Sequence, residues 1–300
     1  MASSGTPLGE RRGGSGNRYR AAPYDEREPL LLPPPRGPTE KALMTAPTLP
    51  VKVDRGDGPA LVLLHGLGNN HESWTYVLRE VDETRNRIIA PDLLGFGDAP
   101  KPQVDYTPGQ HADAVIATLD ELGVTSAVVA GHSMGCIVAA EVARKRPDLV
   151  SRLVLLGAPT FRRIRRTRGR FGSRLAEDRY SAIFNAIADS PDLTITAAKG
   201  LDVFAPLVKG MEITEETWPA FRSSLQHTVM QTRTYRDLTV LPVPTLLVYG
   251  RLDVFVIKRN LKSIARRNRR HVRYETLLGP HEITPVQGRT VAELLQSGAS

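Results

Sequence analysis

Short apolar runs alternate with amphipathic stretches along the chain from about residue 47. The runs are 60–64, 87–90, 127–130, 153–156 and 245–249. Gly, Pro or Asp residues bound them, and runs that are apolar on both faces are typical of buried strands in a parallel sheet. The stretches 109–122, 136–146 and 257–267 are compatible with helices. This alternation predicts an α/β fold with a doubly wound, mostly parallel sheet.

One interval, between residues 159 and 242, contains no strand-like run. Its aromatic residues lie in helix-compatible stretches, and the apolar runs resume after it. We therefore expect a helical cap at 160–242, inserted into an α/β core made of 46–159 and 243–300. Only 47–58 precede the first run, so the leading antiparallel strands are expected to be short or partly missing.

Residues 1–45 have a different composition, rich in Gly, Pro, Arg and Ser and without apolar periodicity. Too little apolar surface is available there to offset the ordering entropy, which predicts a disordered tail. Arg11-Arg12 resembles the start of a twin-arginine signal, but Leu30–Leu32 is too short for its apolar region. Met44 lies where globular character begins, so an over-extended start remains an alternative explanation of the tail.

The most informative segment is Gly131-His-Ser133-Met-Gly135, which follows an apolar run and precedes an Ala- and Val-rich stretch. A tight strand-to-helix turn strains its central residue, and flanking glycines keep Cβ atoms away from the neighbouring backbone. Ser133 would then lie at the carboxyl edge of the sheet and at a helix N-terminus, which favours a nucleophile. An ordinary Gly-Ser loop is the alternative.

Five motifs in this order make residues 47–297 resemble the α/β-hydrolase superfamily, in its serine-nucleophile, cap-bearing branch of esterases and C–C-bond hydrolases. The motifs are His65-Gly-Leu-Gly68, Pro91-Asp-Leu-Leu-Gly-Phe-Gly-Asp98, Gly131-His-Ser-Met-Gly135, Gly250-Arg-Leu-Asp253 and Gly279-Pro-His281. The resemblance implies the fold more specifically than the substrate. It also disfavours dehalogenase and epoxide hydrolase activity, because the nucleophile of those relatives is an aspartate.

A serine hydroxyl needs a general base, and the superfamily order is Ser, then Asp or Glu, then His. Three of the seven histidines follow Ser133, namely His227, His271 and His281. His227 lies in the expected cap and His271 lies before the last strand-like stretch. His281 follows that stretch and a Gly-Pro turn, so we predict it to be the base; a capping or solvated loop histidine is the alternative.

The carboxylate is expected after the penultimate strand, where Asp253 stands three residues past Gly250. A buried carboxylate there would orient the histidine and stabilise its protonated form. A helix N-cap near Ile257 is the alternative role. Asp202 and Glu282 are weaker candidates.

The oxyanion hole requires preorganised N–H donors. The backbone N–H of Met134, after the nucleophile, is one candidate, and the resemblance implies Leu67 as the second. We expect structural roles for His132, Asp92 and Asp98. Cys136, on the helix after the elbow, is expected to be a small buried hydrophobic residue.

These residues predict a serine hydrolase that cleaves a carboxylic ester through an acyl-enzyme. C–C bond hydrolysis of ring-cleavage products, thioester hydrolysis and lactone opening would use the same triad. An acyltransferase or a non-catalytic binding protein on this scaffold are further alternatives. No zinc-spaced Cys/His cluster, dinucleotide fingerprint or phosphate loop is present, so we expect neither cofactor nor metal.

The net charge of +8 comes mostly from arginine, with clusters at 162–170 and 266–273. Such clusters can contact an anionic membrane or an acidic ligand, and a solvated surface is the simpler explanation. No nucleic-acid-binding motif accompanies them, so we expect no nucleic-acid partner. The expected triad implies a small-molecule acyl substrate. The single cysteine, Cys136, suits a reducing compartment, and we expect a cytoplasmic protein of undetermined oligomeric state.

Overall fold

The computed structural model describes residues 46–161, 182, 184–201 and 210–297. The chain divides into two compact units, Met1–Met44 and Thr45–Ser300. The first unit, and with it the tail expected at 1–45, lies outside the described residues. All the described residues belong to the second unit.

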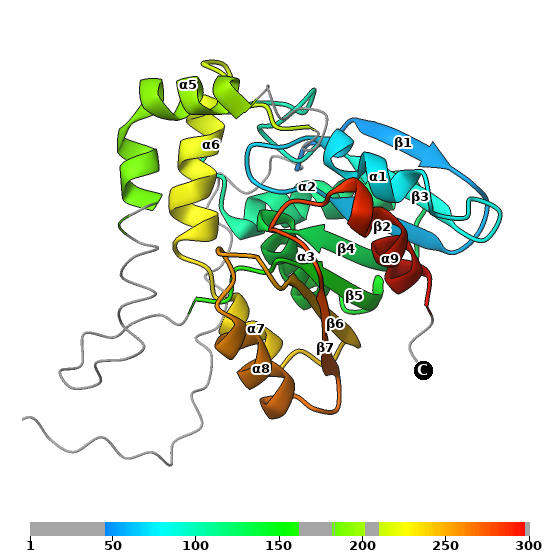
Figure 1. Ribbon diagram of the computed structural model, residues 1–300. Coiled ribbons are helices and arrows are strands. Elements are labelled where there is room, and N and C mark those ends of the chain that lie inside the picture. Colours follow the sequence, from blue (N-terminus) through cyan, green and yellow to red (C-terminus); the bar gives the residue numbers. More distant parts are fainter. Residues whose placement is uncertain (1–45, 162–181, 183, 202–209, 298–300) are drawn as a thin grey trace, which may run out of the picture. The chain divides into compact units, whose positions relative to one another are not determined.

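A mostly parallel sheet of seven described strands forms the centre of this unit (Figure 1). The strands are β1 (Val51–Arg55), β2 (Ala60–Leu64), β3 (Arg87–Pro91), β4 (Ala127–His132), β5 (Val150–Leu156), β6 (Thr245–Gly250) and β7 (Val272–Leu277). Their order is β1-β3-β2-β4-β5-β6-β7, and only β1 pairs antiparallel, with β3. The predicted fold class is therefore confirmed, including a short leading antiparallel strand.

Helices cover both faces of the sheet. The described helices are the 3-10 turn η2 (His71–Trp74), α1 (Thr75–Leu78), α2 (Pro108–Glu121), α3 (Met134–Lys145), α5 (Pro191–Leu201), α6 (Trp218–Ser224), the π-helical turn η4 (Leu225–Val229), α7 (Thr234–Leu238), α8 (Lys258–Arg267) and α9 (Pro285–Gln296). Helices α1 and α9 pack on one face, whereas α2, α3 and α8 pack on the other (Figure 1). None of the described helices is long and apolar enough to cross a bilayer.

Strand β2 shows why apolar runs become central strands. All five of its residues are buried, with Leu61 and Leu63 in the cluster around α1 and α9 and Val62 and Leu64 in the cluster around α2 and α3. Because successive side chains point to opposite faces, a strand covered on both sides must be apolar throughout. Each fully buried leucine contributes roughly 2 kcal/mol of stabilisation.

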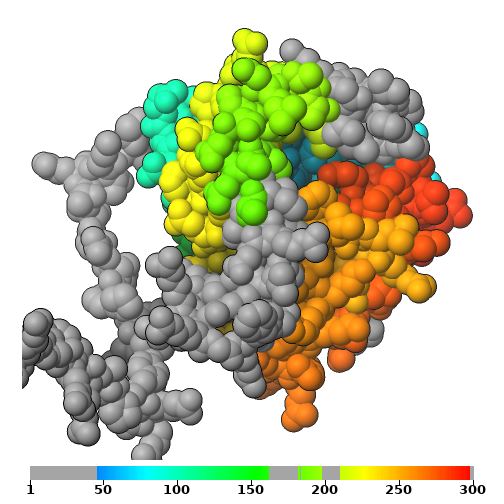
Figure 2. All heavy atoms as spheres, turned by 60° about the vertical axis from the view of Figure 1, so that its left-hand side comes forward, coloured from blue at the N-terminus to red at the C-terminus, as the bar shows by residue number. Residues whose placement is uncertain are grey.

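Between β5 and β6 the described residues form helices and no strand. The segment containing α6 and η4 is attached to the core near the start of α2. Ser224 Oγ lies 3.1 Å from Nε2 of His111, and Thr228 Oγ1 donates to the carbonyl of Tyr106 at 2.6 Å. A Cβ on Gly95 would lie 2.5 Å from that of Ala220, so α6 lies directly on the loop after β3. Figure 2 shows α5 and α6, in green and yellow, together on the surface.

Candidate active site

The turn between β4 and α3 has the strained geometry expected of a nucleophile elbow. Ser133 adopts φ 51° and ψ −116°, a conformation that costs about 1–3 kcal/mol for a residue with a Cβ. A Cβ on Gly131 would lie 2.5 Å from the nitrogen of Cys136, and one on Gly135 would lie 2.7 Å from the carbonyl oxygen of His65. Both glycines are therefore required by close backbone approach, and Ser133 remains half-buried at the sheet edge.

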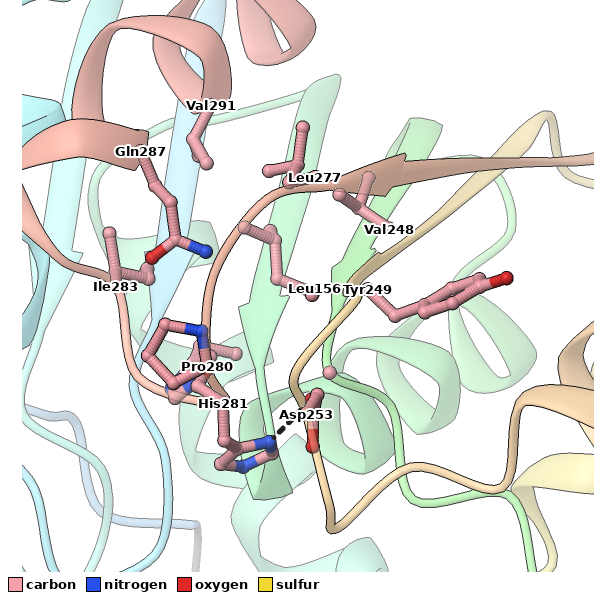
Figure 3. Close-up of a pocket in the computed structure, with 13 residues that line it drawn as sticks. Leu156, Val248, Tyr249, Asp253, Leu277, Pro280, His281, Ile283, Gln287 and Val291 are labelled. Carbon is pink, nitrogen blue, oxygen red and sulfur yellow. Dashed lines mark hydrogen bonds and ion pairs between the residues drawn. The ribbon is translucent and has the colours of Figure 1, made fainter.

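Asp253 and His281 form a hydrogen-bonded pair at the same edge of the sheet (Figure 3). Asp253 follows β6 and His281 lies between β7 and α9, and the Nδ1···Oδ2 distance is 2.8 Å. The second carboxylate oxygen, Oδ1, accepts from the backbone N–H of Phe255 at 2.8 Å. Asp253 is 4% exposed, so both its oxygens are used inside the protein.

The environment of His281 favours its protonated form. Burial opposes protonation, but the hydrogen bond and the charge of Asp253, with a smaller contribution from Glu282, outweigh it and raise the pKa of His281 above 6.5. The hydrogen bond to Asp253 places a proton on Nδ1 in the neutral ring, which leaves Nε2 as the basic atom.

Several contacts place His281 beside the turn that carries Ser133. His132 precedes the serine, its Nε2 lies 2.9 Å from the carbonyl oxygen of His281, and the two ring centroids are 5.0 Å apart. The backbone N–H of Ser133 donates to Leu156, and a Cβ on the next residue, Gly157, would lie 2.9 Å from Cε1 of His281. Ser133 Oγ makes no hydrogen bond to the described residues, a common state before substrate binds.

The loop after β2 passes close to Ser133. A Cβ on Gly66 would lie 3.3 Å from Cβ of Ser133 and 3.2 Å from Nδ1 of His132. Within the described part of the chain, the backbone N–H groups of Leu67 and Met134 have no hydrogen-bond acceptor. Met134 is the first residue of α3, where such N–H groups are free and the helix dipole favours negative charge.

His65, whose role the sequence did not indicate, connects this loop to the loop after β3 by hydrogen bonds. It is fully buried, its Nδ1 lies 2.9 Å from the carbonyl oxygen of Gly66, and its Nε2 accepts from the N–H of Leu93 at 2.8 Å. Burial lowers the pKa of His65 to about 4, so the ring is neutral at pH 7 and can donate at one nitrogen while accepting at the other. Its partner Leu93 lies in the loop after β3, and no local sequence motif indicates this contact.

A second support comes from the segment before α6, which the sequence did not indicate either. Asn69 and Met211 form an isolated antiparallel bridge. The N–H of Glu212 donates to the carbonyl of Gly68 at 2.7 Å, and the N–H of Asn70 donates to Gly210 at 2.8 Å. The loop that carries Leu67 is thus hydrogen-bonded directly to residues 210–212.

The other polar motif residues have structural contacts. Asp92 accepts from the N–H groups of His71 and Asp98, and Asp98 pairs with Lys52. Cys136 is fully buried, and burial raises the pKa of its thiol, so a reactive thiolate is disfavoured.

The other described histidines and acids considered as candidates do not hydrogen-bond to Asp253 or His281 by their side chains. His227 contacts the carbonyl of Asp105, and His271 lies in the turn directly before β7. Glu282 lies next to His281 and acts on it by charge alone. Asp202 and the cluster 162–170 lie outside the described residues.

A small, partly open pocket adjoins the Asp253–His281 pair (Figure 3). It lies between β6, β7 and α9, with Tyr249, Gln287 and Val291 among its lining residues. The residues that line it are mainly those that pack against the loop carrying His281.

Comparison with known proteins gives the family. Residues 61–291 match the sequence profile of the alpha/beta hydrolase family. The chain is 34% identical to a haloalkane dehalogenase of Mycolicibacterium paratuberculosis over 138 residues, which cover 43% of this chain and 44% of that protein. It is 36% identical to a 2-hydroxymuconate semialdehyde hydrolase of a Pseudomonas species over 109 residues, which cover 35% of this chain and 38% of the relative.

Among solved structures, an esterase of Thermogutta terrifontis aligns with a TM-score of 0.60 at 21% identity, covering 83% of this chain and 90% of that one. At this identity the likeness concerns the fold alone. The chain spans between 30% and 44% of the length of the curated relatives that it matches. The profile, however, covers well over half of the chain. The protein therefore belongs to the α/β-hydrolase family.

Proposed function

We propose that this hydrolase cleaves a carboxylic ester through a Ser133–His281–Asp253 triad and an acyl-enzyme. The observation that carries the proposal is the pairing of a strained serine elbow with a buried His–Asp pair at one edge of the sheet. A serine, rather than a carboxylate, occupies the strained position, which favours acyl transfer over alkyl-halide or epoxide chemistry.

In the proposed first step, Nε2 of His281 accepts the proton of Ser133 while Oγ attacks the ester carbonyl carbon. The N–H groups of Leu67 and Met134 stabilise the negative oxygen that forms, because neither has an acceptor in the described protein. Collapse of this intermediate breaks the C–O bond, and His281 returns the proton to the leaving alkoxide. The alcohol departs and leaves Ser133 acylated.

In the second step, His281 takes a proton from water, whose oxygen attacks the acyl-enzyme. The acid leaves and Ser133 regains its proton. Asp253 orients the ring and stabilises its protonated form throughout. We further propose that residues 160–242 form the cap that shapes the acyl pocket, since α6 lies on the loop after β3 near this edge.

A C–C bond hydrolase is the second candidate, favoured by the similarity to the 2-hydroxymuconate semialdehyde hydrolase. The same base and nucleophile would serve, but the leaving group would be a carbon atom that must be protonated. A thioesterase, a lactonase and an acyltransferase would differ in the leaving or accepting group only.

The test is turnover of p-nitrophenyl esters of increasing acyl length by the wild type and by Ser133→Ala, with labelling by a fluorophosphonate probe. We expect turnover and labelling by the wild type, and a loss of about a thousandfold or more in kcat for the variant. Labelling without ester turnover would point to the C–C candidate. If the folded wild type shows neither turnover nor labelling, Ser133 is not an activated nucleophile. A binding protein would then be the favoured function.

A further inference from the structure

A large cluster of positive charge lies between residues 251 and 273. This segment has nine Lys or Arg residues and a single acidic residue, Asp253, which is buried in the pair with His281. Its net charge equals the +8 of the whole chain. The basic residues are Arg251, Lys258, Arg259, Lys262, Arg266, Arg267, Arg269, Arg270 and Arg273. All but the half-buried Lys258 are exposed.

Helix α8 places the first of these charges on one face. It buries Asn260, Leu261, Ser263 and Ile264, whereas Arg259, Lys262 and Arg266 lie on the opposite face. Residues three and four apart share one side of a helix, so these three side chains form a single row. None of the nine basic residues makes an ion pair with any described residue.

An exposed apolar rim adjoins this row. Leu252, Val254 and Leu278 are 64%, 69% and 68% exposed. They lie on the loops that carry Asp253 and His281, which are joined by a hydrogen bond from the N–H of Leu252 to the carbonyl of Gly279 at 3.0 Å. Lys258 Nζ donates to the carbonyl of Arg251 at 2.6 Å, so the row begins beside the rim. In Figure 2 the orange segment, which contains residues 251–278, lies at the lower right of the molecule.

We propose that this surface, the basic row of α8 with the aliphatic rim of Leu252, Val254 and Leu278, docks on an anionic lipid bilayer. Basic residues gain from the negative surface potential of such a bilayer, and exposed aliphatic side chains gain from insertion at the boundary of the acyl chains. A nucleic acid would use the charges but would leave the aliphatic rim in water. The rim lies beside the Asp253–His281 pair, so docking would bring the site to lipid-borne substrates.

The test is co-sedimentation of the full chain with phosphatidylglycerol vesicles and with phosphatidylcholine vesicles at low salt. Each cation near an anionic bilayer raises partitioning by about fivefold. The triple variant R259Q, K262Q, R266Q should therefore bind phosphatidylglycerol vesicles about a hundredfold more weakly. A second variant, L252S, V254S, L278S, should lose the part of the binding that resists high salt, because salt screens only the electrostatic part.

The matched control is R55Q, R79Q, R85Q, which removes the same charge near β1, at the edge of the sheet opposite to β7. It should bind like the wild type. The proposal is wrong if the wild type does not bind phosphatidylglycerol vesicles, if it binds phosphatidylcholine equally, or if the α8 variant binds as the control does. Tighter binding of duplex DNA than of vesicles at the same salt would also overturn it. Turnover of a soluble ester, measured on the same samples, tests the triad separately.

Discussion

Asp253 and His281 give the sharpest expectation at the scale of single residues. In the proposed mechanism a neutral His281 accepts the serine proton, so kcat/KM should rise with pH through an ionisation above 6.5, the direction in which Asp253 shifts the pKa. Asp253→Asn removes this shift, while burial still disfavours the charged ring. We expect kcat/KM to fall about a thousandfold or more and its acidic limb to move to lower pH.

The measurement is kcat/KM for a p-nitrophenyl ester between pH 5 and 9. Glu282 and His132 also act on His281, and both remain in this variant. Asp98→Asn is the matched control, because this loop carboxylate pairs with Lys52 and should leave the profile unchanged. Near-wild-type turnover of Asp253→Asn would remove Asp253 from the triad.

The residues that the sequence could indicate are those with a local signal. The strained position of Ser133 was predictable because the glycines that permit its backbone stand two residues away on either side. Asp253 and His281 followed from their positions after two strands, in an order that the family resemblance supplied. His65 could not be predicted as a support of the Leu67 loop, because its partner Leu93 lies 28 residues away and is defined only by the folded sheet.

At the scale of elements, the bridge between residues 210–212 and the Leu67 loop has a direct consequence. The N–H of Glu212 holds the carbonyl of Gly68 at 2.7 Å. Glu212→Pro deletes this donor and still suits the extended bridge, because proline favours an extended residue before it. A displaced oxyanion donor weakens transition-state binding, so we expect kcat to fall about tenfold to a hundredfold with a smaller change in KM.

Glu212→Ala is the control for this substitution. It keeps the backbone donor and removes only the side-chain contact with Asn70, which is long at 3.4 Å. Affinity for a boronate inhibitor that mimics the tetrahedral intermediate should fall in parallel with kcat in the proline variant alone. Equal effects of both substitutions, or a lower Tm with unchanged kcat, would mean that the bridge is structural and does not position the oxyanion loop.

Elements were predictable where burial fixes their composition. The central strands are covered on both faces, so they appear as unbroken apolar runs. Strand β1 lies at an edge and is only partly buried, which gives it no such run. Helix α9 has a different signal, the capping box of Thr284 and Gln287, which a search for apolar runs does not detect. The contacts of 210–212 are between backbones and leave no trace in residue type.

For the whole molecule, the sequence was most informative about architecture. Five loop motifs in the order of the family are expected to lie together only if their strands end at the same edge of one sheet. The sequence was least informative about the proposed cap and the pocket that we propose it shapes, because the sequence of a cap follows no periodic rule. Three buried histidines add a property that belongs to the folded unit as a whole. Burial lowers the pKa of His65 to about 4 and that of His111 to about 3, and it also lowers that of His132.

These histidines should make the fold sensitive to acid. In the unfolded chain each titrates near 6.5, so below that pH the unfolded state binds more protons and the free energy of unfolding falls. His65 and His111, whose pKa values lie far below 6.5, each contribute about 1.4 kcal/mol per pH unit, and His132 adds to the loss in the same direction. His281 acts in the opposite sense, because its raised pKa gives stability that is complete below 6.5 and is lost as pH rises through the folded value. The net effect is destabilisation from pH 6.5 downward.

Urea unfolding at pH 7.5, 6.5, 5.5 and 5.0 would measure this slope. A typical stability is about 5–15 kcal/mol, so the free energy of unfolding should fall by a large fraction between pH 6.5 and 5.0. His111→Gln can retain the hydrogen bond to Ser224 while removing one titrating group, so its slope should be smaller by about 1.4 kcal/mol per pH unit, whatever its stability at pH 7.5. Stability that stays flat down to pH 5.0 would show that these rings accept protons inside the folded protein, and the same slope in His111→Gln would assign the acid sensitivity to other groups.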